Sequence, residues 1–160
     1  MTSQSAKRMV LLTVIWLLTA GVSFLNAQNA VSFQFRTDHT FRIAQFTDIH
    51  WDPSSAGCAK TVETINYVLN TEKPDLAVLT GDIVTGPPAR EGWNAIAAIF
   101  EKAKVPFAVT LGNHDAEPGI SRDQVFGYLQ TKPYFVGSKG PELSGCGNYS
   151  LPVKSSDGKK

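Results

Sequence analysis

The chain has 160 residues, with 15 lysines and arginines against 14 aspartates and glutamates, which gives a formal net charge of +1. This balance gives no support for a basic nucleic-acid-binding surface, and two cysteines are too few for a disulfide-stapled scaffold. Hydrophobic residues at 42% and charged residues at 18% are typical of a globular domain rather than a disordered or fibrous chain.

Residues 1–27 have the pattern of a secretory signal peptide. A basic start at Lys7 and Arg8 precedes an apolar run over residues 9–25, and the small residue Ala27 marks the expected cleavage point. We therefore expect the mature protein to be secreted or periplasmic. The alternative is an uncleaved membrane anchor, although the apolar run would be roughly 25 Å long as a helix, short of a bilayer core of about 30 Å.

Strand and helix patterns alternate along the rest of the chain. Apolar, β-branched and aromatic runs predict strands at 41–47, 76–80, 106–111 and 148–153. Apolar residues at helical spacing predict helices over 59–71 and 91–104, and Ser121 with Gln124 has the capping-box pattern that begins a helix reaching about Gln130. This order predicts an α/β fold with a parallel β-α-β sheet and right-handed crossovers.

Three of the predicted strands are followed by short polar strings. These strings are Asp48-Ile49-His50, Gly81-Asp82 and Gly112-Asn113-His114-Asp115. The carboxyl ends of parallel strands meet at one edge of a sheet, where α/β proteins bind their ligands. Carboxylate, carboxamide and imidazole groups gathered there suit divalent metals such as Mn, Fe or Zn.

The spacing within these strings allows two metal ions. Asp48 and His50 are two residues apart and share a face of a regular strand, so both can bind one ion, and a carboxylate such as Asp82 can bridge two. Taken alone, Asp-x-His is a weak signal and Gly-Asp is an ordinary turn. The occurrence of all three strings in order, each after a predicted strand, argues against a purely structural interpretation.

The three strings in this order resemble the calcineurin-like metallophosphoesterase superfamily, over roughly residues 40–155. The local sequences of residues 46–50 and 79–86 are similar to those of its purple-acid-phosphatase-like branch. The resemblance implies that residues 28–160 form the N-terminal half of an αββα sandwich. It also implies an enzyme that uses two divalent metal ions to hydrolyse small-molecule phosphomonoesters or phosphodiesters.

The resemblance further implies a role for each residue of the strings. The implied metal ligands are Asp48 and His50 for the first ion, Asp82 for both, and Asn113 for the second. His114 would be a catalytic residue that faces the phosphate ester and stabilises or protonates the leaving oxygen. Asp115 would orient the ring of His114.

The histidine count departs from the family pattern. Family sites use at least three more histidines from the C-terminal half, whereas this chain has three in total. The remaining one, His39, precedes the first strand and lies up to roughly 30 Å from Asp48, too far to complete the site. We therefore expect the 160-residue chain to be inactive alone, as the N-terminal part of an enzyme. The alternative is a non-catalytic exported domain or a truncated remnant.

Two further features leave alternatives open. Cys58 and Cys146 are the one pair that could form a disulfide after export, and the alternative is two free thiols. Trp51 and Arg90 follow two of the metal motifs and could line a substrate pocket, although a packed tryptophan and a solvated arginine are the interpretation that we prefer. The sequence does not identify the substrate.

Overall fold

The computed structural model describes residues 31–159, which form one compact unit. The predicted signal peptide therefore lies outside the described residues. Within the described range, the helices are all too short or too polar to cross a membrane.

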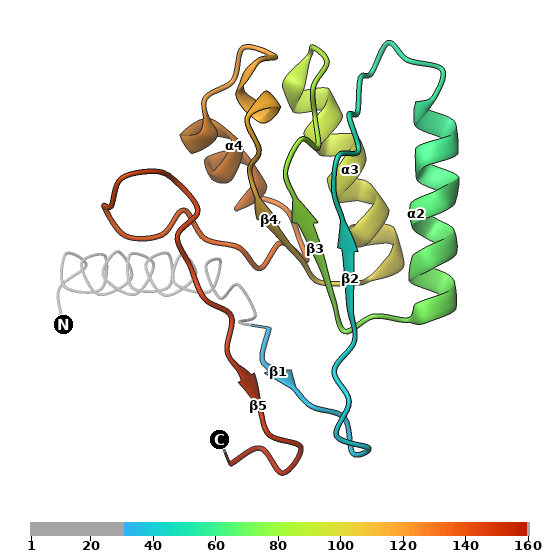
Figure 1. The fold of residues 1–160 in the computed structure, drawn as a ribbon, viewed down its shortest axis with the longest axis vertical. Helices are drawn as coiled ribbons and strands as arrows, with labels where there is room; N and C mark the ends of the chain where they lie inside the picture. The colour runs from blue at the N-terminus through green and yellow to red at the C-terminus, as the bar shows by residue number, and fades with distance from the viewer. Residues whose placement is uncertain (1–30, 160) are drawn as a thin grey trace, which may run out of the picture. The chain divides into compact units, whose positions relative to one another are not determined.

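A parallel sheet lies at the centre of the described unit. Its strands are β2 (Ile43–Phe46), β3 (Leu76–Thr80) and β4 (Phe107–Thr110), in the spatial order β2-β3-β4 (Figure 1). Ile43 lies opposite Leu76, and Ala77 lies opposite Phe107. All strand pairs are parallel, which confirms the predicted β-α-β topology and brings the three carboxyl ends to one edge of the sheet.

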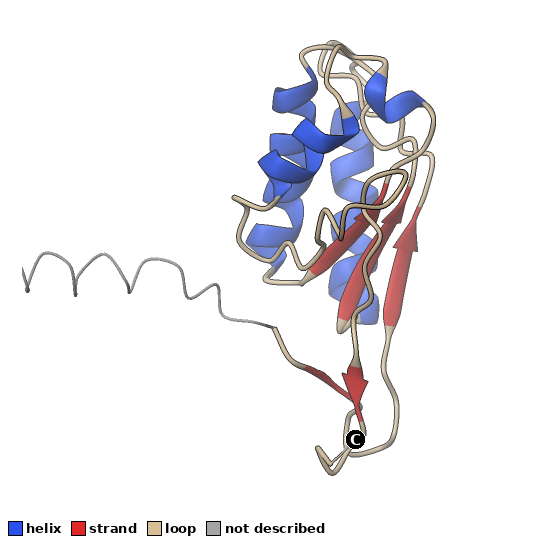
Figure 2. Ribbon diagram, turned by 90° about the vertical axis from the view of Figure 1, so that its left-hand side faces the viewer, coloured by secondary structure: helices blue, strands red, loops and turns tan. Residues whose placement is uncertain are grey.

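Within the described range, two α-helices connect these strands, and a 3₁₀ turn and a third α-helix follow β4. They are α2 (Cys58–Glu72), α3 (Ala89–Ala103), η1 (His114–Ala116) and α4 (Arg122–Leu129). The predicted capping box is present, because the Ser121 side chain accepts from the Gln124 backbone and the Gln124 side chain accepts in return. Figure 2 shows the helices gathered on one face of the sheet. The core lies between these two layers, and the Phe100 ring of α3 stacks on Phe107 of β4 at 5.0 Å.

The opposite face of the sheet is partly covered by the two ends of the described chain. There β1 (Phe33–Gln34) pairs in parallel with β5 (Val153–Lys154). Phe33 packs with Leu76 and Ala108 of the sheet. The sequence did not predict β1, and the predicted strand at 148–153 is wrong in extent, because regular pairing begins only at Val153.

The two edges of the central sheet differ. On the outer edge of β4, the Phe107 N–H donates to the Tyr134 carbonyl, and the Phe107 carbonyl accepts from Val136. The Tyr149 hydroxyl both accepts from the N–H of Val109 and donates to its carbonyl, at 2.9 and 2.7 Å. The main chain satisfies this edge at Phe107, and the Tyr149 side chain satisfies it at Val109.

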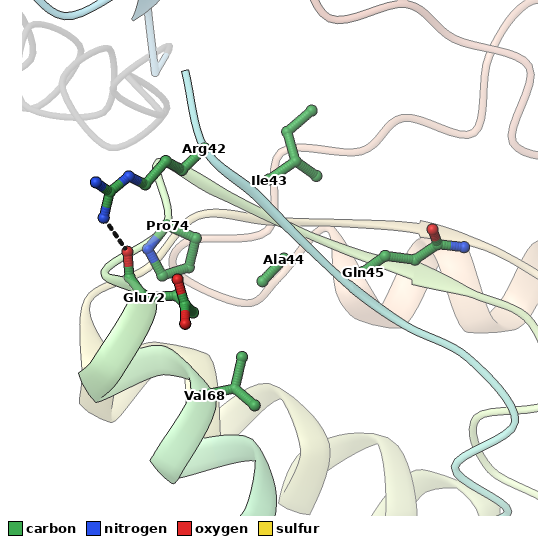
Figure 3. Close-up of a pocket in the computed structure, with 7 residues that line it drawn as sticks. All are labelled: Arg42, Ile43, Ala44, Gln45, Val68, Glu72 and Pro74. Atoms are coloured by element: carbon green, nitrogen blue, oxygen red, sulfur yellow. Dashed lines mark hydrogen bonds between the residues drawn. The ribbon is translucent and has the colours of Figure 1, made fainter. Parts of the chain in front are cut away.

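The outer edge of β2 is open within the described range. There β2 has β3 as its one sheet neighbour, and Ile43 remains 58% exposed. A shallow groove of about 460 Å³ runs between this edge and α2 (Figure 3). Its lining residues are Arg42, Ile43, Ala44, Gln45, Val68, Glu72 and Pro74.

Candidate metal centre

Backbone pairing continues beyond the ends of β2 and β3 and positions the polar strings. The N–H of Asp48 donates to the Gly81 carbonyl at 3.0 Å, and the N–H of His50 donates to the Asp82 carbonyl at 2.9 Å. One residue further, Trp51 donates to the Ile83 carbonyl at 2.8 Å. The relative positions of the two strings are thus set by main-chain hydrogen bonds rather than by their side chains.

Three of the predicted metal ligands lie together. One ligand atom each from Asp48, His50 and Asp82 falls within 4.8 Å of the other two. The Asp48 and His50 side chains are 62% and 50% exposed, and Asp82 is half-buried. Carboxylate and imidazole donors at this spacing, open to solvent, fit a hydrated divalent cation.

The backbone of these three residues adopts an uncommon conformation. Their φ angles are 52° at Asp48, 49° at His50 and 53° at Asp82, all in the left-handed region. Asp and His are among the non-glycine residues that tolerate this region best. The Thr47 hydroxyl donates to the Asp48 carboxylate at 2.6 Å and so holds the side chain beside this turn.

Two glycines allow the second and third strings to approach closely. Gly81 has a φ of 95°, a conformation that favours glycine, so the chain turns sharply directly before Asp82. A Cβ on Gly81 would lie 3.0 Å from the Gly112 Cα. A Cβ on Gly112 would collide with the Asp82 carboxylate, so Gly112 is required by this contact rather than by its own φ.

Asp115 has a different place from the one predicted. Its side chain is fully buried, and its two carboxylate oxygens accept backbone N–H groups from Asp82, Ile83, Val84 and Gly112 at 2.7–3.0 Å. The expectation that Asp115 orients the His114 ring is therefore wrong: both oxygens already bond to the main chain. Asp115 instead ties the loop after β3 to the loop after β4.

His114 lies beside the three clustered side chains. Its backbone N–H donates to Asp82 Oδ1 at 2.9 Å, and its ring centroid is 5.7 Å from that of His50. Its Nδ1 is 2.8 Å from Oε2 of Glu117. This hydrogen bond raises the pKa of His114 above its usual value, partial desolvation opposes the rise, and the charges of Glu117, Asp82 and Asp115 add to it.

Two residues near the centre were missed in the sequence. Glu117 bonds to His114, and the Arg122 guanidinium donates to the Gly112 carbonyl at 2.8 Å. The three-residue spacing between His114 and Glu117 is a signal only once a 3₁₀ or α-helical turn is assumed. Asn113 lies exposed directly before η1, at the same edge of the sheet, and its role as a ligand of a second ion stays a prediction.

The remaining candidates lie away from the cluster. Trp51 is 8% exposed and belongs to the main core, which fits a packing role. Arg90 is exposed and lies over the Tyr128 ring at 5.6 Å. Cys58 and Cys146 carry free thiols, which is the second of the two alternatives that the sequence leaves open.

The two cysteines have different polar neighbours. Cys58 Sγ donates to the Asp52 carbonyl at 3.0 Å, whereas Cys146 lies beside Asp123, and burial raises the pKa of its thiol. The groove of Figure 3 is lined by none of the clustered metal-ligand candidates.

Comparisons with known proteins identify a family and several relatives. A family model for calcineurin-like phosphoesterases matches residues 41–155. The chain is similar to "Probable inactive purple acid phosphatase 29" of Arabidopsis thaliana, with 32% identity over 142 residues, covering 75% of this chain and 36% of the relative. It is also similar to "Phosphatase DCR2" of Saccharomyces cerevisiae, with 28% identity over 140 residues, covering 73% of this chain and 24% of the relative. The chain thus spans about a quarter to two fifths of the length of the curated relatives it matches.

Proposed function

Because the chain belongs to the calcineurin-like phosphoesterase family, we propose that it carries metal-binding motifs of an enzyme that hydrolyses phosphomonoesters or phosphodiesters. The observation that carries the proposal is the convergence of Asp48, His50 and Asp82 ligand atoms within 4.8 Å at the carboxyl ends of two adjacent strands. The family normally uses divalent metals, and this donor set fits them.

Each residue of the centre has a defined part in the proposal. Asp48 and His50 would hold one ion, Asn113 would hold the second, and Asp82 would be shared by both. Bound divalent ions supply Lewis-acid polarisation of the phosphoryl oxygens. His114 stabilises the leaving oxygen or gives it a proton, and its place beside His50 at the exposed edge of the sheet supports this role.

A second candidate function is a metal-binding domain without hydrolase activity. One observation favours it: three of the Arabidopsis relatives are named probable inactive purple acid phosphatases. Metal binding without turnover distinguishes this candidate from the first.

Export is a separate part of the proposal. It is supported by the basic start and apolar run of residues 1–27, which have the order of a signal peptide. Sequencing the N-terminus of protein from its native host tests it. A mature start near Gln28 supports export with cleavage, whereas membrane-bound material that begins at Met1 would establish an anchor instead.

Metal binding is tested with Mn²⁺ and Zn²⁺ by calorimetry and elemental analysis on the 160-residue chain. We expect weak binding that Asp82→Asn abolishes, because Asp82 is placed to touch both ions. Asp157→Asn is the matched control, since this exposed carboxylate lies in the turn after β5 and bonds to Ser155 and Lys159. Equal metal binding by Asp82→Asn and by the control would contradict the proposal.

Hydrolysis is tested with an aryl phosphate and an aryl phosphodiester, with and without a chelator. We expect no turnover by the 160-residue chain and chelator-sensitive turnover by the product of its complete reading frame. In that product His114→Ala should retain the metals and lower kcat by about 10²–10⁴-fold. If His114→Ala loses metal as completely as Asp82→Asn, the role given to His114 is wrong.

A further inference from the structure

We propose that Glu117 is the residue that positions the His114 imidazole. This inference rests on the proposed function insofar as it gives His114 a part in hydrolysis. The contact itself is a property of the described chain.

The 3₁₀ turn after β4 brings the two side chains together. A 3₁₀ helix has three residues per turn, so side chains at positions i and i+3 lie one above the other. His114 begins η1 and Glu117 is its C-terminal cap, and the Glu117 N–H donates to the His114 carbonyl at 3.0 Å. The closed turn places Oε2 of Glu117 2.8 Å from Nδ1 of His114.

The neighbouring carboxylate is not free to play this part. Asp115 is fully buried and accepts four backbone N–H groups with its two oxygens. Among the residues that the structure describes, Glu117 is the one recorded with a hydrogen bond to the His114 ring. Asp115 therefore joins the loops after β3 and β4, whereas Glu117 bonds to the His114 ring.

Two bonds together fix His114. Its backbone N–H is anchored on Asp82, and its Nδ1 is directed at Glu117. An imidazole that donates from Nδ1 presents a bare Nε2 when neutral and an Nε2–H when charged. Glu117 therefore favours the tautomer of the ring that carries its proton on Nδ1, and it holds the ring in one orientation.

The pair is exposed, and this exposure makes the inference testable. The His114 and Glu117 side chains are 40% and 59% exposed, so their ion pair contributes little to folding. Removing the Glu117 carboxylate should therefore change the orientation and tautomer of the His114 ring and leave the fold intact.

The first test is ¹⁵N NMR of the histidine rings in the 160-residue chain, at a pH where the rings are neutral. The chain has three histidines, so the His114 signal is assigned with His39→Gln and His50→Gln variants. We expect Nδ1 of His114 to be protonated in the wild type and in Glu117→Gln, whose amide oxygen still accepts. Glu117→Ala should move the proton to Nε2, the site that a free histidine side chain prefers.

The control for this measurement is Glu101→Ala, which removes an exposed carboxylate from α3, away from the site. It should leave the His114 ring signals unchanged. An unchanged Nδ1 signal in Glu117→Ala would overturn the inference, because it would show that Glu117 does not determine which ring nitrogen of His114 carries the proton.

The second test is turnover by the product of the complete reading frame. Glu117→Ala should lower kcat by about 10-fold or more, with KM and metal content unchanged, and Glu117→Gln should recover part of the loss. An active enzyme whose kcat is unaffected by Glu117→Ala would overturn the catalytic part of the inference. If the wild type shows no turnover while the tautomer shift is observed, the proposed hydrolase function fails and the positioning of His114 stands.

Discussion

The candidate metal centre joins a locked side and an open side. On the locked side, the loops after β3 and β4 are bound together by the buried Asp115 carboxylate and by the close contact of Gly81 with Gly112. On the open side, the string after β2 is exposed, and β2 is the unpaired edge of the described sheet. The same contrast holds at the sheet edges, since Tyr149 covers β4 and Ile43 of β2 is exposed.

This difference separates the stability of the site from its chemistry. Asp82 sits on the locked side, where its carboxylate also accepts the His114 N–H. Asp48 and His50 sit on the open side, where water and ions have access. We therefore expect changes on the locked side to lower the stability of the fold, and changes on the open side to alter binding or association at nearly constant stability.

The largest effect is expected from Asp115→Ala. Four backbone N–H groups in a buried setting would lose their acceptor, so the free energy of unfolding should fall by about 3–5 kcal/mol. Urea unfolding followed by circular dichroism measures this change. Asp123→Asn, an exposed carboxylate paired with Lys139, is the control and should stay within about 0.5 kcal/mol of the wild type. A similarly small effect for Asp115→Ala would contradict the claim that the Asp115 carboxylate holds the loops after β3 and β4 together.

Gly112→Ala should come next in size. The new Cβ would collide with the Asp82 carboxylate and displace it, which we expect to lower the stability by about 1–3 kcal/mol and to weaken metal binding at least as strongly as Asp48→Ala does.

The matched control is Gly127→Ala in α4, where a Cβ meets no atom within 4 Å. This control should stabilise the helix by about 0.5–1 kcal/mol. Thermal unfolding and calorimetric Mn²⁺ titration of both variants give the answer. Unaltered metal binding in Gly112→Ala would show that Asp82 is not confined by this contact.

Tyr149→Phe probes the covered edge of β4 and should have a moderate effect. It removes the hydroxyl that satisfies both the N–H and the carbonyl of Val109 while it retains the ring, so the expected loss is about 1–2 kcal/mol. Hydrogen exchange of the Val109 amide should speed up at the same time. Tyr67→Phe, on an exposed tyrosine of α2, serves as the control. Equal stabilities of the two variants would contradict the claim that the Tyr149 hydroxyl stabilises the outer edge of β4.

Ile43→Lys probes the open edge of β2 and should have the smallest effect on stability, within about 0.5 kcal/mol. An exposed, unpaired edge strand promotes association of chains, and a lysine there opposes it. Sedimentation at increasing concentration should therefore show less self-association for the variant than for the wild type. Equal or greater self-association of the variant would argue that the chains do not associate through the β2 edge.

The sequence was sufficient to predict the sheet and the convergence of the strings. The strands of the central sheet are short apolar runs, and the parallel order of such runs fixes which ends meet. The grouping of Asp48, His50 and Asp82 followed from that rule alone. The capping box at Ser121 was equally local and equally visible.

Other features depended on conformations that no residue pattern encodes. The β1–β5 pair has two residues in each strand, too few to show a period of two. The partner of the His114 ring depends on whether the chain turns as a 3₁₀ helix after Asn113, and on whether the next carboxylate faces inward. Asp115 faces inward because the loop after β3 presents three consecutive N–H groups to it, a property of the backbone path rather than of the residue types.

The left-handed backbone at Asp48, His50 and Asp82 sets the fold and the chemistry in opposition at the same three positions. A non-glycine residue in that region carries about 1–2 kcal/mol of strain, which glycine would relieve. Drift under selection for folding alone would therefore move these positions toward glycine and erase the ligands. Asp, His and Asp at these positions therefore place their side chains at a cost in stability, and we expect a relative without the chemistry to carry glycine or asparagine at these three sites first.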